Sequence, residues 1–275
     1  MATKYLAAGS ITFASPAWSG GAIANTDDLV IAEPFGIVAI GLNQSALAGL
    51  ESVWIKPTCT AGRIGGGASG SFLVDVDNSS DAFVANQGGV ELYIAAAGPS
   101  GKIENLDQSG PGSTYITAGT VDDVTISQGR LTANGSAVIV NLVAVGGSSM
   151  IEYNATAITS AEFHGGNHTV RRAVTTLTVS GGATVVYDPD DAATITGTTI
   201  VTRGGRLVHR AGATPTIINR GGTYDLSQAR ISFTPGGTSW TAIGTRITQS
   251  TSVPITNLAR VFGSQIVASD GPVPV

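Results

Sequence analysis

The carboxylates of the first third of the chain are its best candidates for ligand chemistry. Asp75, Asp77 and Asp81 lie in one short segment, and alternation along a strand would place Asp75 and Asp77 on the same face. Carboxylate oxygens are ligands that Ca²⁺ prefers, but an EF-hand loop also requires a glycine at its sixth position and a glutamate at its twelfth, where Asn86 stands. The sequence therefore favours a solvated acidic turn, with calcium binding left open.

A second acidic turn contains Asp188, Asp190 and Asp191 and carries the same two interpretations. The histidines are His164, His168 and His209. His164 and His168 flank a Gly-Gly-Asn corner, so their four-residue spacing does not place them on one face, as it would on a helix. We therefore expect histidines at the surface or at corners, and no metal site.

Carbohydrate-active enzymes need carboxylates that converge on one groove. Counted from the second glycine of the nearest glycine pair, Glu152, Asp188 and Asp225 stand five, six and three residues further on. This count predicts that they do not share a column of stacked residues. It favours a protein that is not an enzyme.

The segment 65–70 has the glycine spacing of a dinucleotide-binding loop. Such a loop needs a following helix whose N-terminus meets the pyrophosphate, but the next residues, 71–76, alternate like a strand. A flexible loop is the better interpretation, and no cofactor is expected. Cys59 is the only cysteine, which excludes an intramolecular disulfide and predicts a small buried residue.

Composition excludes further classes of protein. Charged residues make up only 12% of the 275 residues and the net charge is -5, whereas a nucleic-acid binder needs clustered Lys and Arg. The most apolar stretch, 29–42, is interrupted by Glu33, Pro34 and Gly36 and is too short to span a bilayer. The first residues lack the apolar core of a secretory signal. We expect no membrane partner and no nucleic-acid partner.

A repeated phrase dominates the second half of the chain. An apolar, Thr-rich run is followed by Gly or Gly-Gly, a second apolar run and a polar turn, at intervals of 16 to 23 residues between Gly129 and Gly221. Val, Ile and Thr suit strands, and glycine supplies the positive φ values of sharp corners. The repeat is near the length of one coil of strands. It predicts an all-β protein, a right-handed parallel β-helix (β-solenoid), with a β-sandwich as the alternative.

The repeat divides the chain into three predicted parts. Residues 1–28 form an irregular N-terminal anchor segment, 29–235 form the parallel β-helix, and 236–275 form a C-terminal cap and extended arm. Solenoids need caps because a terminal rung exposes backbone groups and apolar interior. Trp18 and Trp240 lie in the two flanking parts and are the candidate partner-binding residues.

Several patterns together resemble a known class of protein. They are Ala17-Trp18-Ser19-Gly20-Gly21, the run from Thr26 to Ile31, the run Gly36-Ile-Val-Ala-Ile-Gly-Leu and the glycine-pair repeat. This combination resembles virion-associated β-solenoid proteins of tailed bacteriophages. The resemblance implies a non-enzymatic structural protein of the virion, assembled in the host cytoplasm. Its expected role is capsid decoration as a homotrimer bound to the major capsid protein or another virion protein. The alternative is a tail fibre or spike that binds or cleaves glycans.

Overall fold

The structure is a computed structural model. It describes residues 2–5, 23–34, 37–38, 49–66, 70–153, 156–189, 198–211, 216–228, 240–243, 246–250, 258–260 and 265–269. In these segments every regular element is a β-strand, and no helix is long and apolar enough to cross a membrane. The chain divides into two compact units, Met1–Val140 and Asn141–Val275.

The first unit is built from strands that pair in parallel, most of them short. They are β1 (Thr3–Tyr5), β2 (Asp28–Ile31), β3 (Ile37–Val38), β4 (Ser52–Ile55), β5 (Arg63–Ile64), β6 (Phe72–Val74), β7 (Phe83–Asn86), β8 (Glu91–Ala96), β9 (Lys102–Gln108), β10 (Ser113–Ile126) and β11 (Arg130–Ala133), and β12 (Ala137–Ala144) leads out of the unit.

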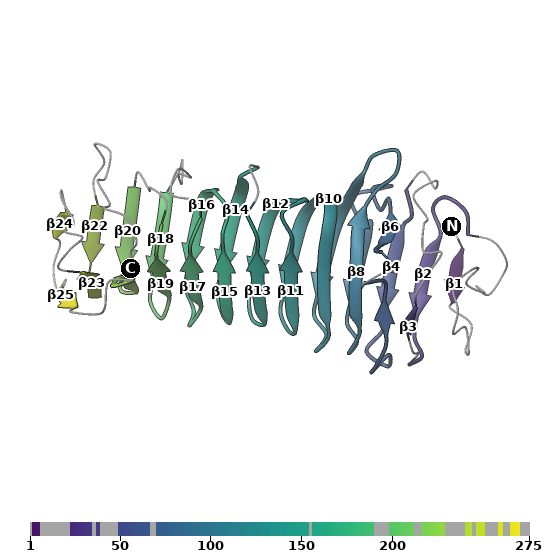
Figure 1. Ribbon diagram of the computed structural model, residues 1–275, viewed down its shortest axis with the longest axis horizontal. Coiled ribbons are helices and arrows are strands. Elements are labelled where there is room, and N and C mark those ends of the chain that lie inside the picture. Colours follow the sequence, from purple (N-terminus) through teal and green to yellow (C-terminus); the bar gives the residue numbers. More distant parts are fainter. Residues whose placement is uncertain are drawn as a thin grey trace. The chain divides into compact units, whose positions relative to one another are not determined.

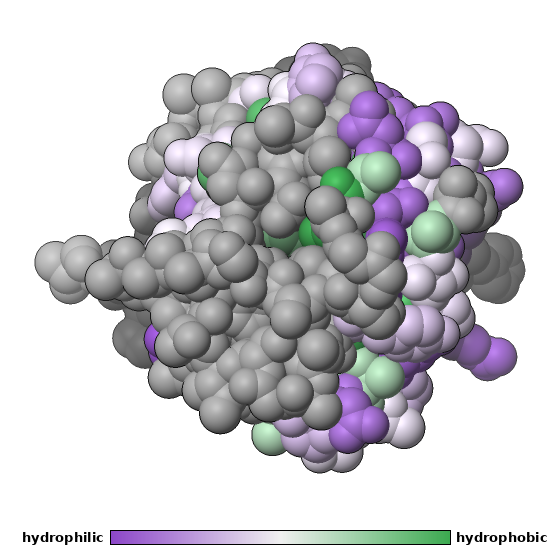
Figure 2. All heavy atoms as spheres, turned by 90° about the vertical axis from the view of Figure 1, so that its right-hand side faces the viewer, coloured by the Kyte–Doolittle hydropathy of each residue, from purple (hydrophilic) through white to green (hydrophobic). Residues whose placement is uncertain are grey.

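These strands form two ladders, which we call the first and second sheets. The first sheet stacks β1, β2, β4, β7, β9 and the end of β10, and the second stacks β3, β5, β8, the start of β10 and β11. Strand β6 also pairs with β8. Strand β10 passes from the second sheet to the first at Gly119, whose φ of 80° is in the left-handed region that favours glycine. Seen from the β1 end, the described side chains are mostly hydrophilic, with small hydrophobic patches (Figure 2).

The second unit repeats this two-sheet rung with regular spacing (Figure 1). Its strands after β12 are β13 (Ser148–Ile151), β14 (Ile158–Phe163), β15 (Asn167–Val170), β16 (Val174–Val179), β17 (Thr184–Tyr187), β18 (Thr198–Thr202), β19 (Arg206–His209), β20 (Thr216–Arg220), β21 (Thr223–Leu226), β22 (Trp240–Ile243), β23 (Arg246–Ser250), β24 (Leu258–Arg260) and β25 (Gln265–Ser269).

Each glycine pair of the repeat separates the two strands of one rung. Gly165 and Gly166, for example, stand between β14 in the first sheet and β15 in the second. Even-numbered strands stack in parallel in the first sheet and odd-numbered strands in the second. The predicted all-β parallel solenoid is therefore confirmed, and the β-sandwich is not.

Apolar residues fill the interior as stacked columns. In the first sheet of the second unit, Ala161 lies beside Leu177, and Phe163 lies beside Val179, which in turn lies beside Val201; all are fully buried. Burial of this kind contributes about 25 cal/mol per Å² of apolar surface removed from water, so the columns supply the main stabilisation of the coil.

Strand pairing also occurs in both predicted flanking parts. Strand β1, which lies in residues 1–28, pairs with β2, and β22 to β25 continue the two ladders after residue 235. The ladders therefore extend beyond the glycine repeat. Parallel pairing depends on the register of backbone hydrogen bonds, so a rung can pair even where its corner has no glycine pair. Anchor and cap roles for these parts stay predictions.

Candidate functional site

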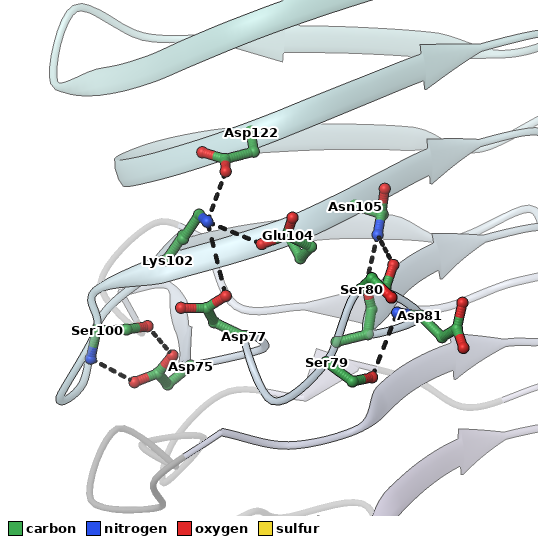
Figure 3. Close-up of polar contacts among 11 residues, drawn as sticks. Asp75, Asp77, Ser79, Ser80, Asp81, Ser100, Lys102, Glu104, Asn105 and Asp122 are labelled. Carbon is green, nitrogen blue, oxygen red and sulfur yellow. Dashed lines mark hydrogen bonds and ion pairs between the residues drawn. The ribbon is translucent and has the colours of Figure 1, made fainter.

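The three carboxylates that the sequence grouped together turn to different partners (Figure 3). Strand β6 ends at Val74, so the expected alternation does not continue through Asp75 and Asp77. Asp75 is buried and accepts hydrogen bonds from the backbone N–H of Ser100, at 2.8 Å, and from the Ser100 hydroxyl. Asp77 faces Lys102, and Asp81 is exposed. The grouped ligand set that calcium binding would need is therefore not assembled here.

A lysine with three carboxylate neighbours lies beside this segment. The Nζ atom of Lys102 is 2.6 Å from Asp122, 2.8 Å from Glu104 and 3.6 Å from Asp77. The hydrogen bond to Asp122, followed by that to Glu104, raises the pKa of Lys102 above its ordinary value. The register that pairs Val121 with Ile103 sets Asp122 beside Glu104, and the ammonium group relieves the repulsion between them. This group could not be predicted from the sequence because its members are far apart along the chain.

We expect Lys102→Met to lower the free energy of unfolding by about 1 kcal/mol, because Glu104 and Asp122 would then lie side by side without a cation. The loss should shrink as ionic strength rises, since salt screens partly exposed charges. Urea unfolding at two salt concentrations measures both effects. Lys56→Met is the matched control, because the Lys56 ammonium lies over the Trp54 ring. A loss that does not depend on salt would contradict the electrostatic role of Lys102.

Within the segments described by the structure, no group of three His, Cys, Asp or Glu side chains is placed to hold a metal ion. The histidines take two kinds of position. His164 is partly exposed at a corner, as expected, and its Nδ1 lies 2.6 Å from the Ser180 hydroxyl. His168 and His209 are buried, so the prediction of surface or corner histidines is wrong for both. They occupy inward positions of the second sheet, which the strand register sets and glycine spacing did not reveal.

The buried histidines are held in defined tautomers. Nε2 of His209 is 2.8 Å from the Ala211 carbonyl, which can only accept, so Nε2 carries the hydrogen. Nδ1 then accepts from the Tyr224 hydroxyl at 2.6 Å. His168 has the same pattern, with the Gly165 carbonyl at 2.7 Å and the Ser149 hydroxyl at 2.9 Å. These contacts make both histidines structural parts of the core.

Two of the candidate catalytic carboxylates belong to one column, contrary to the sequence prediction. Residues that follow the second-sheet strands of successive rungs are Glu152, Arg171, Asp188 and Arg210, so acid and base alternate. Arg171 is 3.3 Å from Glu152, and Arg210 is 3.8 Å from Asp188. The count from glycine failed because Ala183 adds one residue between its glycine pair and β17.

Asp225 belongs to a different column of the second sheet. It lies beside Val208, accepts a hydrogen bond from Arg206 at 2.7 Å and another from the Ser227 hydroxyl at 2.6 Å. Burial opposes ionisation, but the hydrogen bonds from Ser227 and Arg206 outweigh it and lower the pKa of Asp225. Each of the three candidate carboxylates therefore has an arginine neighbour, an arrangement that stabilises stacked rungs.

Aromatic side chains form two outward-facing pairs on the first unit. Trp54 and Phe83 make an edge-to-face contact on the first sheet, with ring centroids 5.8 Å apart, and the Trp54 N–H donates to Gln87 at 2.9 Å. Tyr93 and Tyr115 stack on the second sheet with centroids 4.3 Å apart. Half-exposed aromatic rings are common anchors for partners and for sugars. These pairs could not be singled out from residue types alone, because pairing across rungs depends on register.

The two candidate partner-binding residues chosen from the sequence are Trp18 and Trp240. Trp18 lies outside the described residues. Trp240 is the first residue of β22 and pairs with Ile217 and Leu258 through the backbone. Partner binding by either stays a prediction.

The remaining sequence candidates have structural roles. Gly66 of the glycine-rich loop packs against the ring of Tyr93, where a Cβ atom would collide with it. Cys59 is buried as expected, and burial raises the pKa of its thiol to about 11. Such a thiol is a poor nucleophile at neutral pH.

Comparison with known proteins adds no relative. No family profile, curated protein or solved structure matches this chain. The fold and the contacts of the ionisable side chains are therefore the observations from which a function is inferred.

Proposed function

We propose that this chain is a non-enzymatic structural protein of a phage virion, a capsid decoration protein that binds the head as a homotrimer. The proposal is supported by the β-solenoid fold together with the resemblance of the sequence to virion-associated solenoids. The partners are then further copies of the chain and the major capsid protein or another virion protein.

The observation that carries the proposal is the way in which carboxylates are used. Glu152, Asp188 and Asp225 each lie beside an arginine, and Asp77 lies beside Lys102. In glycoside hydrolysis two carboxyl groups must face the scissile bond of the sugar, whereas the oxygens of these carboxylates face an arginine or lysine side chain. These contacts favour rung-to-rung stabilisation, so the coil serves as a rigid surface.

Adding the purified chain to heads of the encoding phage that lack it tests the proposal. We expect saturable binding, and a rise of several degrees in the temperature at which the heads release DNA. Sedimentation with heads measures binding, and dye access to DNA during heating measures stability. Heads that neither bind the chain nor gain stability would contradict a decoration role.

Glycan binding is a second candidate, favoured by the outward Trp54 and Phe83 pair. An aromatic ring that stacks on a sugar contributes a large share of binding, so Trp54→Ala would reduce affinity for host polysaccharide about tenfold. Thr125→Ala, on the same outward face, is the matched control. Release of reducing ends that is lost in Asp188→Asn or Asp225→Asn would instead support a depolymerase.

A further inference from the structure

One outward face of the second unit is almost free of charge. On the first sheet, register places Glu162 beside Thr178, Thr178 beside Ile200, and Ile200 beside Ile218. Ser160 and Thr176 lie beside each other in the adjacent outward column. We call this the threonine–isoleucine face, composed of Ser160, Glu162, Thr176, Thr178, Ile200 and Ile218. Glu162 is its single charged residue.

The second sheet of the same unit presents a different surface. Arg206 and Asp225 form an ion pair on its outward side. The alternating column that begins with Glu152 and Arg171 follows the ends of its strands. The charges of the unit are therefore concentrated on one sheet and largely absent from the outward columns of the other.

The side chains of the threonine–isoleucine face suit a protein interface. Thr178, Ile200 and Ile218 are partly exposed and point away from the buried core residues beside them in sequence. All three are β-branched, so their χ1 angles are already restricted in a strand and little side-chain entropy is lost on association. Ile200 and Ile218 are neighbours and form an apolar centre of the threonine–isoleucine face. Exposed Arg220 lies toward the rim of this face. An apolar centre within a polar rim is the usual composition of an interface.

Charge distribution selects the occupant. When copies are related by an axis parallel to the stacking direction, each rung lies opposite the same rung of its neighbour. Like charges would then meet like charges, which costs several kcal/mol at an interface. Near such an axis each residue meets its own copies, which carry the same charge, so a nearly uncharged ladder is suited to self-association. The strands of two copies have the same spacing of about 4.8 Å, so their side chains can stay aligned along the whole face.

We infer that the threonine–isoleucine face is the surface through which copies of this chain associate. The inference rests on the proposed homotrimer and names the residues that hold it together. The ladder of Thr178, Ile200 and Ile218 meets the same ladder of the other copies along the axis that relates them. The charged second sheet stays outside this contact.

The double variant Ile200→Lys, Ile218→Lys tests this inference by placing like charges opposite each other. Light scattering on a sizing column should give a multiple of 27.6 kDa for the unchanged chain and the monomer mass for the variant. Val186→Lys is the matched control, because Val186 is a partly exposed outward residue on the second sheet. We expect it to keep the oligomer. Circular dichroism checks that each variant is folded.

The possible outcomes distinguish a failure of the proposed interface from a failure of the proposed decoration role. An unchanged chain that is monomeric at micromolar concentration overturns self-association. A folded double variant that stays oligomeric, or dissociation by Val186→Lys alone, overturns the choice of face. If the double variant does not fold, the single variant Thr178→Lys decides by the same criterion. The decoration role itself fails only if heads do not bind the chain, whatever its mass.

Discussion

Gly181→Ala should destabilise the second unit by roughly 3 to 5 kcal/mol, a large part of the stability of an ordinary domain. Gly181 has a φ of 57°, where a residue with a side chain is strained by about 1 to 2 kcal/mol. A Cβ atom there would also collide with the carbonyl oxygen of His164 in the preceding rung. Because that oxygen belongs to the backbone, the two rungs must separate to make room.

Gly182→Ala is a matched control in the same corner. Gly182 has a φ of 92°, but a Cβ atom at this position would have no atom within 4 Å. The expected loss is therefore only the conformational strain, about 1 to 2 kcal/mol. Denaturant unfolding of both variants measures the difference. Equal losses would mean that close rung-to-rung approach at Gly181 does not limit the coil.

Acidification should destabilise the second unit through His168 by up to about 2 kcal/mol between pH 7 and pH 5. Burial lowers the pKa of His168 below its ordinary value of 6.5, despite an opposing hydrogen bond to the Gly165 carbonyl. As pH falls below about 6.5, the unfolded chain binds a proton more readily than the folded one. Stability is therefore complete above pH 6.5 and decreases as the pH falls, until the folded-state pKa is reached.

His168→Gln removes this titration while an amide N–H can still donate to the Gly165 carbonyl. Unfolding free energies of both proteins, measured from pH 7.5 to pH 5, should converge as the pH falls. The comparison cancels the titration of carboxylates common to both proteins. If the unfolding free energies of the two proteins differed by the same amount at every pH in this range, protonation of His168 would not be what destabilises the folded chain.

Much of the fold could be predicted because the glycine corners recur in sequence. The two apolar runs that the repeat places on either side of Gly181 and Gly182 form β16 and β17. Strands such as β9 were missed because their sequence, Lys-Ile-Glu-Asn-Leu-Asp-Gln, is mostly polar. Its pairing with β7 and β10 is set by neighbouring rungs, and not by its own apolar content.

The side-chain contacts were harder to predict because a rung can gain a residue without changing the repeat. The added Ala183 moved Asp188 into the column of Glu152 and Arg171, which counting from glycine had excluded. The contacts of Lys102 likewise depend on which residues of β10 lie beside β9. Inward burial of His168 follows from strand alternation once the first residue of β15 is known. Register, more than residue type, decides these positions.

The copy number of the chain in purified particles tests the proposed role as a structural component of the phage head. Heads and tails of the encoding phage would be separated and the chain quantified by mass spectrometry against the major capsid protein. We expect the chain to remain with the heads, in a fixed ratio and in multiples of three copies. Absence from the particles, or presence only with tails, would contradict it.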